Sequence, residues 1–230
     1  MKAPCYTLNA LMVGQIRPLG KTGAQSGIAK AAVDHELELG LTGFTADAQG
    51  DLKVHGGIEK AVHHYPHDHY AAWQADIGPH ALLSRPGAFG ENLSTSGLSE
   101  KNVAIGDIFK LGSAIIEVSQ GRQPCWKLNE RFSVNTMARK VQRTGRTGWY
   151  YRVLEPGVVT PSDRLVMIER RSPDWTIERI WRSFYVDTLN LPELEAIANL
   201  TALAPSWREH ARRRIASGKV EDWTHRLDGK

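Results

Sequence analysis

Several features that mark particular protein classes are scarce or missing in this sequence. Its 230 residues include two cysteines, Cys5 and Cys125, which are too few for a disulfide framework and favour a reducing cytoplasm. Apolar runs stay well short of the roughly 18 residues that cross a membrane, and the N-terminus has no signal-peptide pattern. We therefore expect a cytoplasmic protein with no membrane partner. A Cys5–Cys125 bridge is the less favoured alternative to two free thiols.

Motifs for electron carriers are missing as well. The sequence has no CxxC set for an iron–sulfur cluster, no haem attachment motif and no GxGxxG for a flavin or nicotinamide. The 29 Lys and Arg against 25 Asp and Glu give a net charge of +4, which suits a small anionic ligand. The basic stretch 208–219 lies in a tail, residues 171–230, that carries 10 Lys and Arg against 9 Asp and Glu. We therefore expect no nucleic-acid partner.

The pattern of apolar residues predicts a mainly β protein with added helices. Short apolar runs bounded by glycine and polar residues are typical of strands, and their irregular spacing favours a barrel or sandwich of mostly antiparallel pairs. Leu111-Gly112-Ser113 is expected to form the turn of a hairpin. The predicted strands lie within 11–18, 103–111, 113–120, 150–157 and 164–171.

Helical spacing appears in two places within this β-rich part and then throughout the tail. We expect helices over 59–77, broken near Pro66, and over 133–143. The tail predicts three more: one after Pro173, one near 192–203, and one near 206–216 with Ser206 as its cap and Gly218 at its end. The sequence thus divides into residues 1–170, a β domain, and residues 171–230, a small three-helix domain.

Three glycine-containing loops carry polar residues suited to an anionic ligand. In the first, Gly56 and Gly57 follow Lys53 and His55 and can present backbone N–H groups before a helix. An ordinary turn is the simpler interpretation of that loop alone. The histidines near it also raise a zinc hypothesis, which the missing HExxH and CxxC motifs disfavour.

The other two loops are equally ambiguous when each is considered alone. Glu91 and Asn92 follow two glycines in the stretch 87–98, and can face a polar heterocycle. Arg146 and Arg152 lie in 143–157, where arginine forks suit phosphate or carboxylate groups. Together with a fourth loop around Cys125, these loops favour a single site for an anionic ligand over four unrelated turns.

Cys125 is the most informative residue in that fourth loop, QGRQPCWKLN. Arg122 and Lys127 flank it, and nearby cations favour the thiolate form of a cysteine. A thiolate there could act as a nucleophile, a persulfide carrier or a ligand to a soft metal. A buried, inert thiol is the alternative, and no cysteine-protease signature accompanies the residue.

These motifs, taken in order, resemble the MOSC domain, the family named from the C-terminal domain of molybdenum cofactor sulfurase. The resemblance rests on KVHGG (53–57), FGENL (89–93), PCWKLN (124–129) and GWYYRV (148–153), and covers roughly residues 8–225. It is closest to the bacterial stand-alone members linked to 6-N-hydroxylaminopurine resistance, which carry a three-helix tail. At the position after GLTG (40–43) where the family often has an acid, this chain has Phe44, with Asp47 three residues later. The role of that segment is therefore left open.

The resemblance implies a MOSC-type β-barrel followed by three helices, and an enzyme that uses the molybdenum cofactor, a molybdopterin complex. It implies that Cys125 ligates the metal and that the reaction is a two-electron reduction of N-hydroxylated compounds such as hydroxylaminopurines, hydroxylamines and amidoximes. The residues expected to bind cofactor or line the substrate side are Lys53, His55, Gly56, Gly57, Glu91, Asn92, Arg122, Arg146 and Arg152.

A separate reductase must supply the electrons, because the chain has no electron-carrier motif of its own. The alternative function is a carrier, either of persulfide sulfur on Cys125 or of the cofactor itself. Trp175, Trp181 and Trp207 must bury against something, and the sequence leaves open whether that is this chain's own barrel or a second copy in a homodimer.

Overall fold

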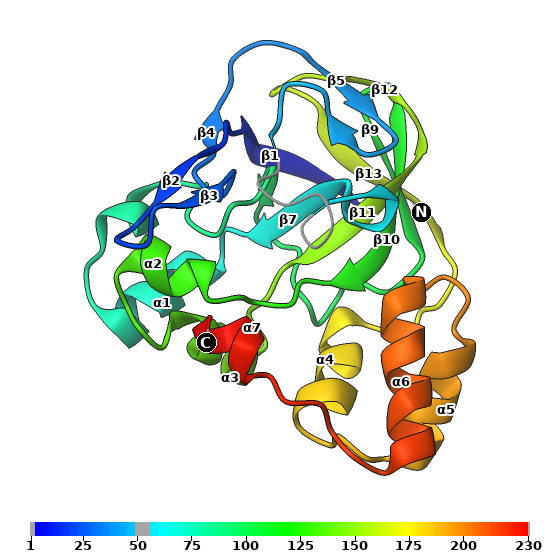
Figure 1. Cartoon of the computed structure of the whole chain (residues 1–230). Helices are drawn as coiled ribbons and strands as arrows, with labels where there is room; N and C mark the ends of the chain where they lie inside the picture. The colour runs from blue at the N-terminus through cyan, green and yellow to red at the C-terminus, as the bar shows by residue number, and fades with distance from the viewer. Residues whose placement is uncertain (1–2, 49–55, 230) are drawn as a thin grey trace.

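The computed structural model describes residues 3–48 and 56–229, and its centre is a closed barrel of seven strands (Figure 1). In barrel order the strands are β13, β9, β10, β11, β7, β8 and β1, and β1 pairs back with β13 to close the ring. The pairs are antiparallel except β7 with β8, which is parallel. The bounds are β1 Cys5–Val13, β7 Val62–Pro66, β8 Leu93–Thr95, β9 Asp107–Leu111, β10 Ala114–Gly121, β11 Trp149–Glu155 and β13 Arg164–Arg170. The prediction of a β-barrel with added helices is confirmed.

Shorter strands extend this barrel at its rim. β4 (Ala31–Ala32) pairs with the end of β1, and β2 (Arg17–Leu19) pairs with β3 (Ala24–Ser26). β5 (Leu37–Gly40) pairs with both β6 (Gly43–Phe44) and β12 (Gly157–Val159). The predicted β9–β10 hairpin is confirmed. Its turn requires Gly112, which has φ +59° and lies too close to the Val158 carbonyl for a side chain.

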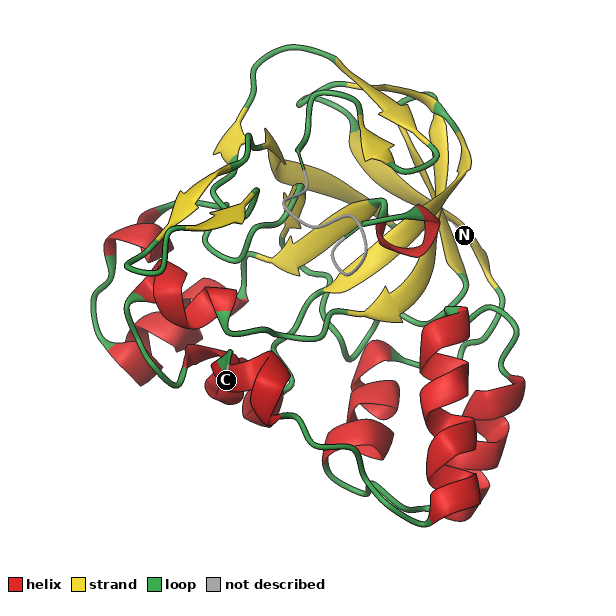
Figure 2. Cartoon of the chain, viewed as in Figure 1, coloured by secondary structure: helices red, strands yellow, loops and turns green. Residues whose placement is uncertain are grey.

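The helices form two groups below the barrel in the view of Figure 2. One group holds α1 (His69–Ile77), α2 (Lys127–Phe132), α3 (Met137–Thr144) and α7 (Thr224–Asp228). The other holds α4 (Ile177–Tyr185), α5 (Leu191–Asn199) and α6 (Pro205–Ser217). Two single turns, Ile58–Lys60 (η1) and Ala81–Ser84 (η2), complete the regular structure of the described residues. None of the described helices has the length and apolar composition that crossing a membrane requires.

Several predicted element boundaries were wrong for identifiable reasons. Residues 62–66 form a buried strand rather than a helix, because they pair with both β11 and β8 and all five are buried. The N-cap position of α6 is held by Ala204, not Ser206, because Pro205 occupies the first turn, and no side chain of the described residues caps the helix there. α5 ends at Asn199, because the chain turns there and brings the Ala204 N–H to the Ser119 carbonyl of the barrel. α2 and α7 were not predicted.

One continuous hydrophobic cluster joins the barrel to helices α4, α5 and α6. Trp207 is 3% exposed, packs edge-on against Phe184 and lies beside Gly121 of β10. Trp181 donates its indole N–H to the Gln142 carbonyl, and Trp175 packs against the cluster. These tryptophans therefore contact their own chain and do not require a second copy. The homodimer and the division at residue 170 stay predictions.

A histidine inside the barrel makes stability depend on pH. His64 is fully buried between the Tyr151 hydroxyl and the Thr95 hydroxyl, each 2.9 Å from a ring nitrogen. Burial lowers the pKa of His64 to about 3. The unfolded chain takes up a proton near pH 6.5 whereas the folded chain does not, so the stabilisation is complete above pH 6.5 and is lost as pH falls towards 3.

We expect the free energy of unfolding to fall by up to about 1.4 kcal/mol per pH unit through this residue over that window. Urea unfolding at a series of pH values measures the slope. His64→Gln should flatten it, while His35→Gln, a change at an exposed histidine, should not. Equal slopes in all three proteins would contradict the assignment.

Candidate functional site

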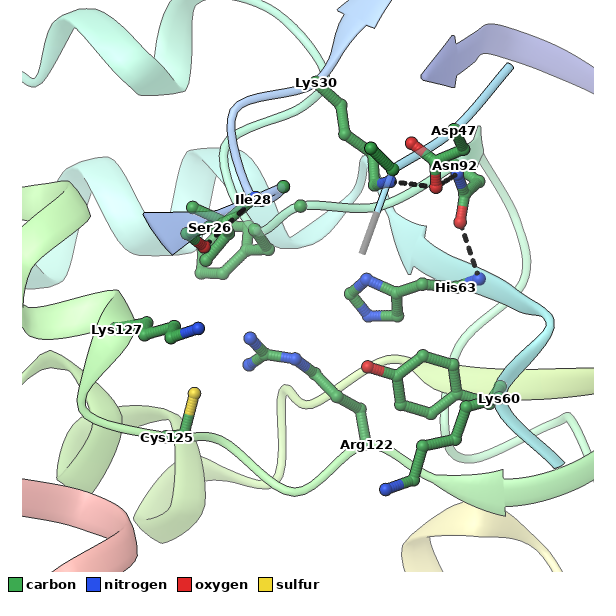
Figure 3. A pocket seen from close by; sticks show the side chains of 15 residues that line it. Ser26, Ile28, Lys30, Asp47, Lys60, His63, Asn92, Arg122, Cys125 and Lys127 are labelled. Atoms are coloured by element: carbon green, nitrogen blue, oxygen red, sulfur yellow. Dashed lines mark hydrogen bonds and ion pairs between the residues drawn. The ribbon is translucent and has the colours of Figure 1, made fainter. Parts of the chain in front are cut away.

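A pocket lies at one end of the barrel, where six segments far apart in the sequence meet (Figure 3). It encloses about 590 Å³ of space that no protein atom fills, its open mouth included. The segments are the loop after β3, the stretch after β6, η1 with the start of β7, the loop before β8, the segment after β10, and β11. The lining residues are Ser26, Gly27, Ile28, Lys30, Asp47, Ala48, Lys60, His63, Phe89, Gly90, Asn92, Arg122, Cys125, Lys127 and Tyr150.

Cys125 reaches the pocket because the chain leaves the barrel at the end of β10. The Arg122 N–H donates to the Gly148 carbonyl at 3.0 Å, and the Cys125 carbonyl accepts from the Leu128 N–H at 2.9 Å as α2 begins. Cys125 is partly exposed and forms no disulfide. Figure 3 places its sulfur, the Arg122 guanidinium and the Lys127 ammonium around the same space. The thiol is thus available to a ligand in the pocket.

Positive charge dominates the lining. Lys30, Lys60, Arg122 and Lys127 contribute four cations, against the single carboxylate of Asp47. Arg122 is 6% exposed, and its Nη1 atom has no hydrogen-bond partner in the part of the chain that the structure describes. Because a buried guanidinium N–H normally has an acceptor, this atom indicates that the pocket accommodates a polar or anionic ligand.

Two neutral groups border this guanidinium. Burial lowers the pKa of His63 well below its ordinary value, and the charge of Arg122 adds to the effect. Burial raises the pKa of the Tyr150 hydroxyl, and Arg122 opposes that shift. His63 therefore carries no charge at neutral pH while Tyr150 keeps its proton.

Behind the cations, the Asn92 side chain forms hydrogen bonds to three other segments of the chain. Its side chain donates to Asp47 at 2.9 Å and to the Met12 carbonyl at 3.1 Å, and accepts from the backbone N–H of His63 at 3.1 Å. Asp47 also accepts from the Gly14 N–H at 2.7 Å and forms an ion pair with Lys30. Burial lowers the pKa of Lys30, and the paired carboxylate opposes that shift. Asn92 therefore fixes the carboxylate that holds Lys30 in place.

The structure places the other predicted site residues differently. Glu91 is buried behind the pocket wall, where it accepts from the Tyr70 hydroxyl at 2.5 Å, the Gly87 N–H at 2.7 Å and the Phe89 N–H at 3.0 Å. It shapes the loop that carries Phe89 and Gly90, and so acts on the pocket from outside it.

The two arginines of the third loop also lie away from the pocket lining. Arg146 is paired with Asp76 and stacks 3.8 Å from the centre of the Trp73 ring. Arg152 is paired with Glu59 and Glu117 at 2.6 Å each. Both guanidinium groups therefore already have anionic partners within the chain.

The first loop is described only in part. Lys53 and His55 lie outside the described residues. Gly57 has φ +92° and its carbonyl accepts from the Lys60 N–H at 2.9 Å, so it begins η1, with Gly56 just before it. Gly57 lines a second hollow together with Asp47, next to the main pocket. No group of three His, Cys, Asp or Glu side chains that could hold a metal occurs in residues 3–48 and 56–229.

Sequence reasoning missed Ser26, Lys30, His63 and Tyr150 as pocket residues. His63 sits in the stretch expected to be helical, and Lys30 lies in a segment without a recognisable motif. Asp47 was noted only as an acid displaced by three positions from Phe44. Asp47 itself was the one clue in the sequence to a buried lysine, since a carboxylate near a basic site is a natural partner for such a lysine.

Comparison with known proteins shows which families this chain matches. The model of the MOSC domain matches residues 51–166, and that of the YiiM-like, 3-alpha helix domain matches residues 175–218. Protein YiiM of Escherichia coli is 41% identical over 208 residues, which are 90% of this chain and 92% of that protein. The crystal structure of YiiM from Escherichia coli superposes with a TM-score of 0.79 at 36% identity and covers 93% of this chain and 98% of that one. A protein of Gibberella moniliformis named reductase is 42% identical over 158 residues, 68% of this chain but 28% of the fungal one.

Proposed function

The chain belongs to the MOSC family, and from that premise we propose that it is a molybdenum-cofactor-dependent reductase of N-hydroxylated compounds. The observation that carries the proposal is the pairing, in one pocket, of a thiol and a buried guanidinium with one N–H group that lacks an acceptor among the described residues. Cys125 supplies a soft sulfur donor, and the Nη1 atom of Arg122 supplies an N–H without an acceptor among the described residues.

The pocket residues fit this cofactor in charge and in chemistry. Lys60, Arg122 and Lys127 would hold its phosphate and the polar edges of its ring system, because charge-assisted hydrogen bonds suit such groups. Phe89 and Tyr150 add aromatic surface beside them. Cys125 would ligate molybdenum, since a thiolate is the donor type that transition metals of this kind accept. When bound, the cofactor supplies a metal centre that exchanges two electrons with an N–O bond.

The chain's own residues would orient the substrate and hold protons. Reduction of R–NHOH to R–NH₂ and H₂O consumes two electrons and two protons. Tyr150 keeps its hydroxyl proton at neutral pH and lines the pocket, and the Lys30 ammonium is held there by Asp47. These two groups are therefore the proton-bearing side chains that we place on the substrate side, and the cations beside them would orient the polar N–O group.

The electrons would come from a second protein. The sequence has no motif for a flavin, haem or iron–sulfur cluster. The fungal protein named reductase is far longer than the segment that this chain matches, so most of it has no counterpart here. We propose that a separate reductase fulfils that role, and that hydroxylaminopurines, hydroxylamines and amidoximes are the substrate class.

The direct test is to express the chain in a host that makes molybdenum cofactor. Molybdenum and pterin are then measured per chain, and turnover of 6-N-hydroxylaminopurine is followed with a chemically reduced viologen as electron donor. Near-stoichiometric cofactor with turnover supports the proposal. Cyanide-releasable sulfur on Cys125 without turnover would instead support the persulfide carrier. Bound cofactor without either would point to a cofactor carrier, and absence of molybdenum and pterin would overturn the proposal.

A matched pair of arginine variants separates pocket residues from the predicted residues outside the pocket. Arg122→Met should lower the affinity for cofactor about 10- to 100-fold, because one hydrogen bond to a charged group contributes roughly 1.5–3 kcal/mol. Arg146→Met removes the same charge from a residue paired with Asp76 and should leave cofactor content unchanged. The measurement is molybdenum and pterin retained per chain after dialysis. Equal losses in both variants would contradict the assignment of Arg122.

A further inference from the structure

The last ten residues of the described chain lie outside both matched regions, which end at residues 166 and 218. After α6 the chain crosses to the other group of helices and ends with α7 beside α3 (Figure 1). This segment, residues 220–229, brings Arg226 to the loop that carries Cys125. The contacts made there involve the two peptide groups that flank the cysteine.

Arg226 bonds to the backbone on both sides of Cys125. Its Nη1 donates to the Pro124 carbonyl, and its own carbonyl accepts from the Trp126 N–H at 2.8 Å. Its Nη2 donates to the Gln142 side chain of α3 at 2.5 Å. The peptide units before and after Cys125 are planar, so fixing both of them restricts the two backbone dihedrals of the cysteine.

The segment is anchored well enough to impose this geometry. Leu227 is 1% exposed, and its carbonyl accepts from the Asn129 side chain of α2 at 2.9 Å. Gly229 has φ +73°, and a Cβ there would lie 2.9 Å from the Trp126 ring, so the ring rests on the glycine backbone. Arg139 of α3 pairs with Asp228 at 2.9 and 2.6 Å.

We propose that Arg226 is a positioning residue that holds the Cys125 thiol within the cationic pocket. The purpose of this arrangement rests on the proposed function, because a metal ligand must stay in a fixed place. The geometry itself concerns only the thiol and the four pocket cations, Lys30, Lys60, Arg122 and Lys127. It can therefore be measured on full-length protein made in a host that lacks the cofactor.

The test compares alkylation of Cys125 by iodoacetate and by iodoacetamide, in a Cys5→Ser background that leaves one thiol. The two reagents share a leaving group and differ in charge, so the ratio of their rate constants reports how close the thiol is to the pocket cations. Arg226→Met should lower the ratio about fivefold or more, the size of one ion pair at a partly exposed site. Arg226→Lys, which keeps the charge at position 226 but loses the fork, should lower it as well, and loss of the Arg226 charge alone cannot explain a fall in that variant. Arg139→Gln, which loses the Asp228 pair but keeps the Arg226 contacts, should leave the ratio within about twofold.

An unchanged ratio in folded Arg226→Met protein would overturn the proposal, and so would a fall of the same size in Arg139→Gln, because the segment as a whole and not Arg226 would then hold the thiol. Urea unfolding checks that each variant is folded. Should Arg226→Met fail to fold, Arg226→Lys decides, because it keeps the charge but loses the fork: an intermediate ratio supports positioning and an unchanged ratio refutes it. A correctly held thiol in a protein that binds no cofactor would count against the proposed function and leave this inference intact.

Discussion

Cys125→Ser should reduce turnover of N-hydroxylated substrate by more than about 100-fold under the proposed function, in which Cys125 ligates the metal, since losing a direct metal ligand costs at least as much as the 10- to 100-fold typical of its outer partners. The serine preserves the size of the side chain and the backbone contacts of the loop, including the bond from the Leu128 N–H to the residue 125 carbonyl. Molybdenum content should fall or its spectroscopic signature should change. Pterin should be partly retained, because Arg122 and the lysines remain. The measurements are kcat with reduced viologen, and metal and pterin per chain.

Cys5→Ser is the matched control for this prediction. Cys5 lies at the start of β1, opposite Val166 of β13, and does not line the pocket. Its replacement should leave turnover unchanged. Cys125→Ser protein with more than a tenth of the original kcat would exclude the thiol as a necessary ligand.

Much of the barrel could be predicted because its strands carry local signals. The β9–β10 hairpin joins two apolar runs at a glycine that the close approach of β12 requires, and β13 is a single apolar run of ordinary length. β7 could not be predicted in this way. Its residues, VHHYP, contain two histidines and a proline, and they are extended only because β8 and β11 pair with them on both sides. Pairing of that kind is decided by distant residues and overrides local preference.

The difference between local signals and contacts made by distant residues also explains which site residues could be predicted. Cys125, Arg122 and Lys127 are neighbours in sequence, so their meeting in the pocket follows from one short loop. Lys30 and Asp47 come from separate loops and meet through Asn92, which no spacing reveals. Arg146 and Arg152 looked equally suitable for an anion, but the structure pairs each with carboxylates that the fold brings to it. Arginine content alone therefore identifies a basic region but not the arginines that line the pocket.

Asp47→Asn should lower the free energy of unfolding by about 3–5 kcal/mol, the usual cost of breaking a buried ion pair from one side. The Lys30 and Asp47 side chains are 7% and 5% exposed, and Arg122 lines the same pocket, so the ammonium would lose its direct carboxylate partner and keep only the weaker charge interaction with Glu91. Asparagine keeps an oxygen for the Gly14 N–H, but its amide NH2 group replaces the Oδ2 atom that accepts from Lys30 and from Asn92, so the bond from the Asn92 side chain is lost together with the charge. The loss should shrink as pH rises, because Lys30, whose pKa is already lowered, can then become neutral.

Two further variants make this prediction specific. Lys30→Met combined with Asp47→Asn leaves no unpaired buried charge from this pair, so it should recover more than half of the stability that Asp47→Asn loses. Asp34→Asn removes the same charge from a fully exposed side chain and should change stability by less than about 0.5 kcal/mol. Urea unfolding at pH 7 and pH 9 measures all four proteins. A single-variant loss below about 1 kcal/mol, or a double variant no more stable than the single one, would show that the pair is not held as a buried unit. Recovery in the double variant would instead assign the cost to the stranded ammonium. In that case Asp47, three residues beyond the position where the family often has an acid, serves to keep Lys30 charged at the pocket wall.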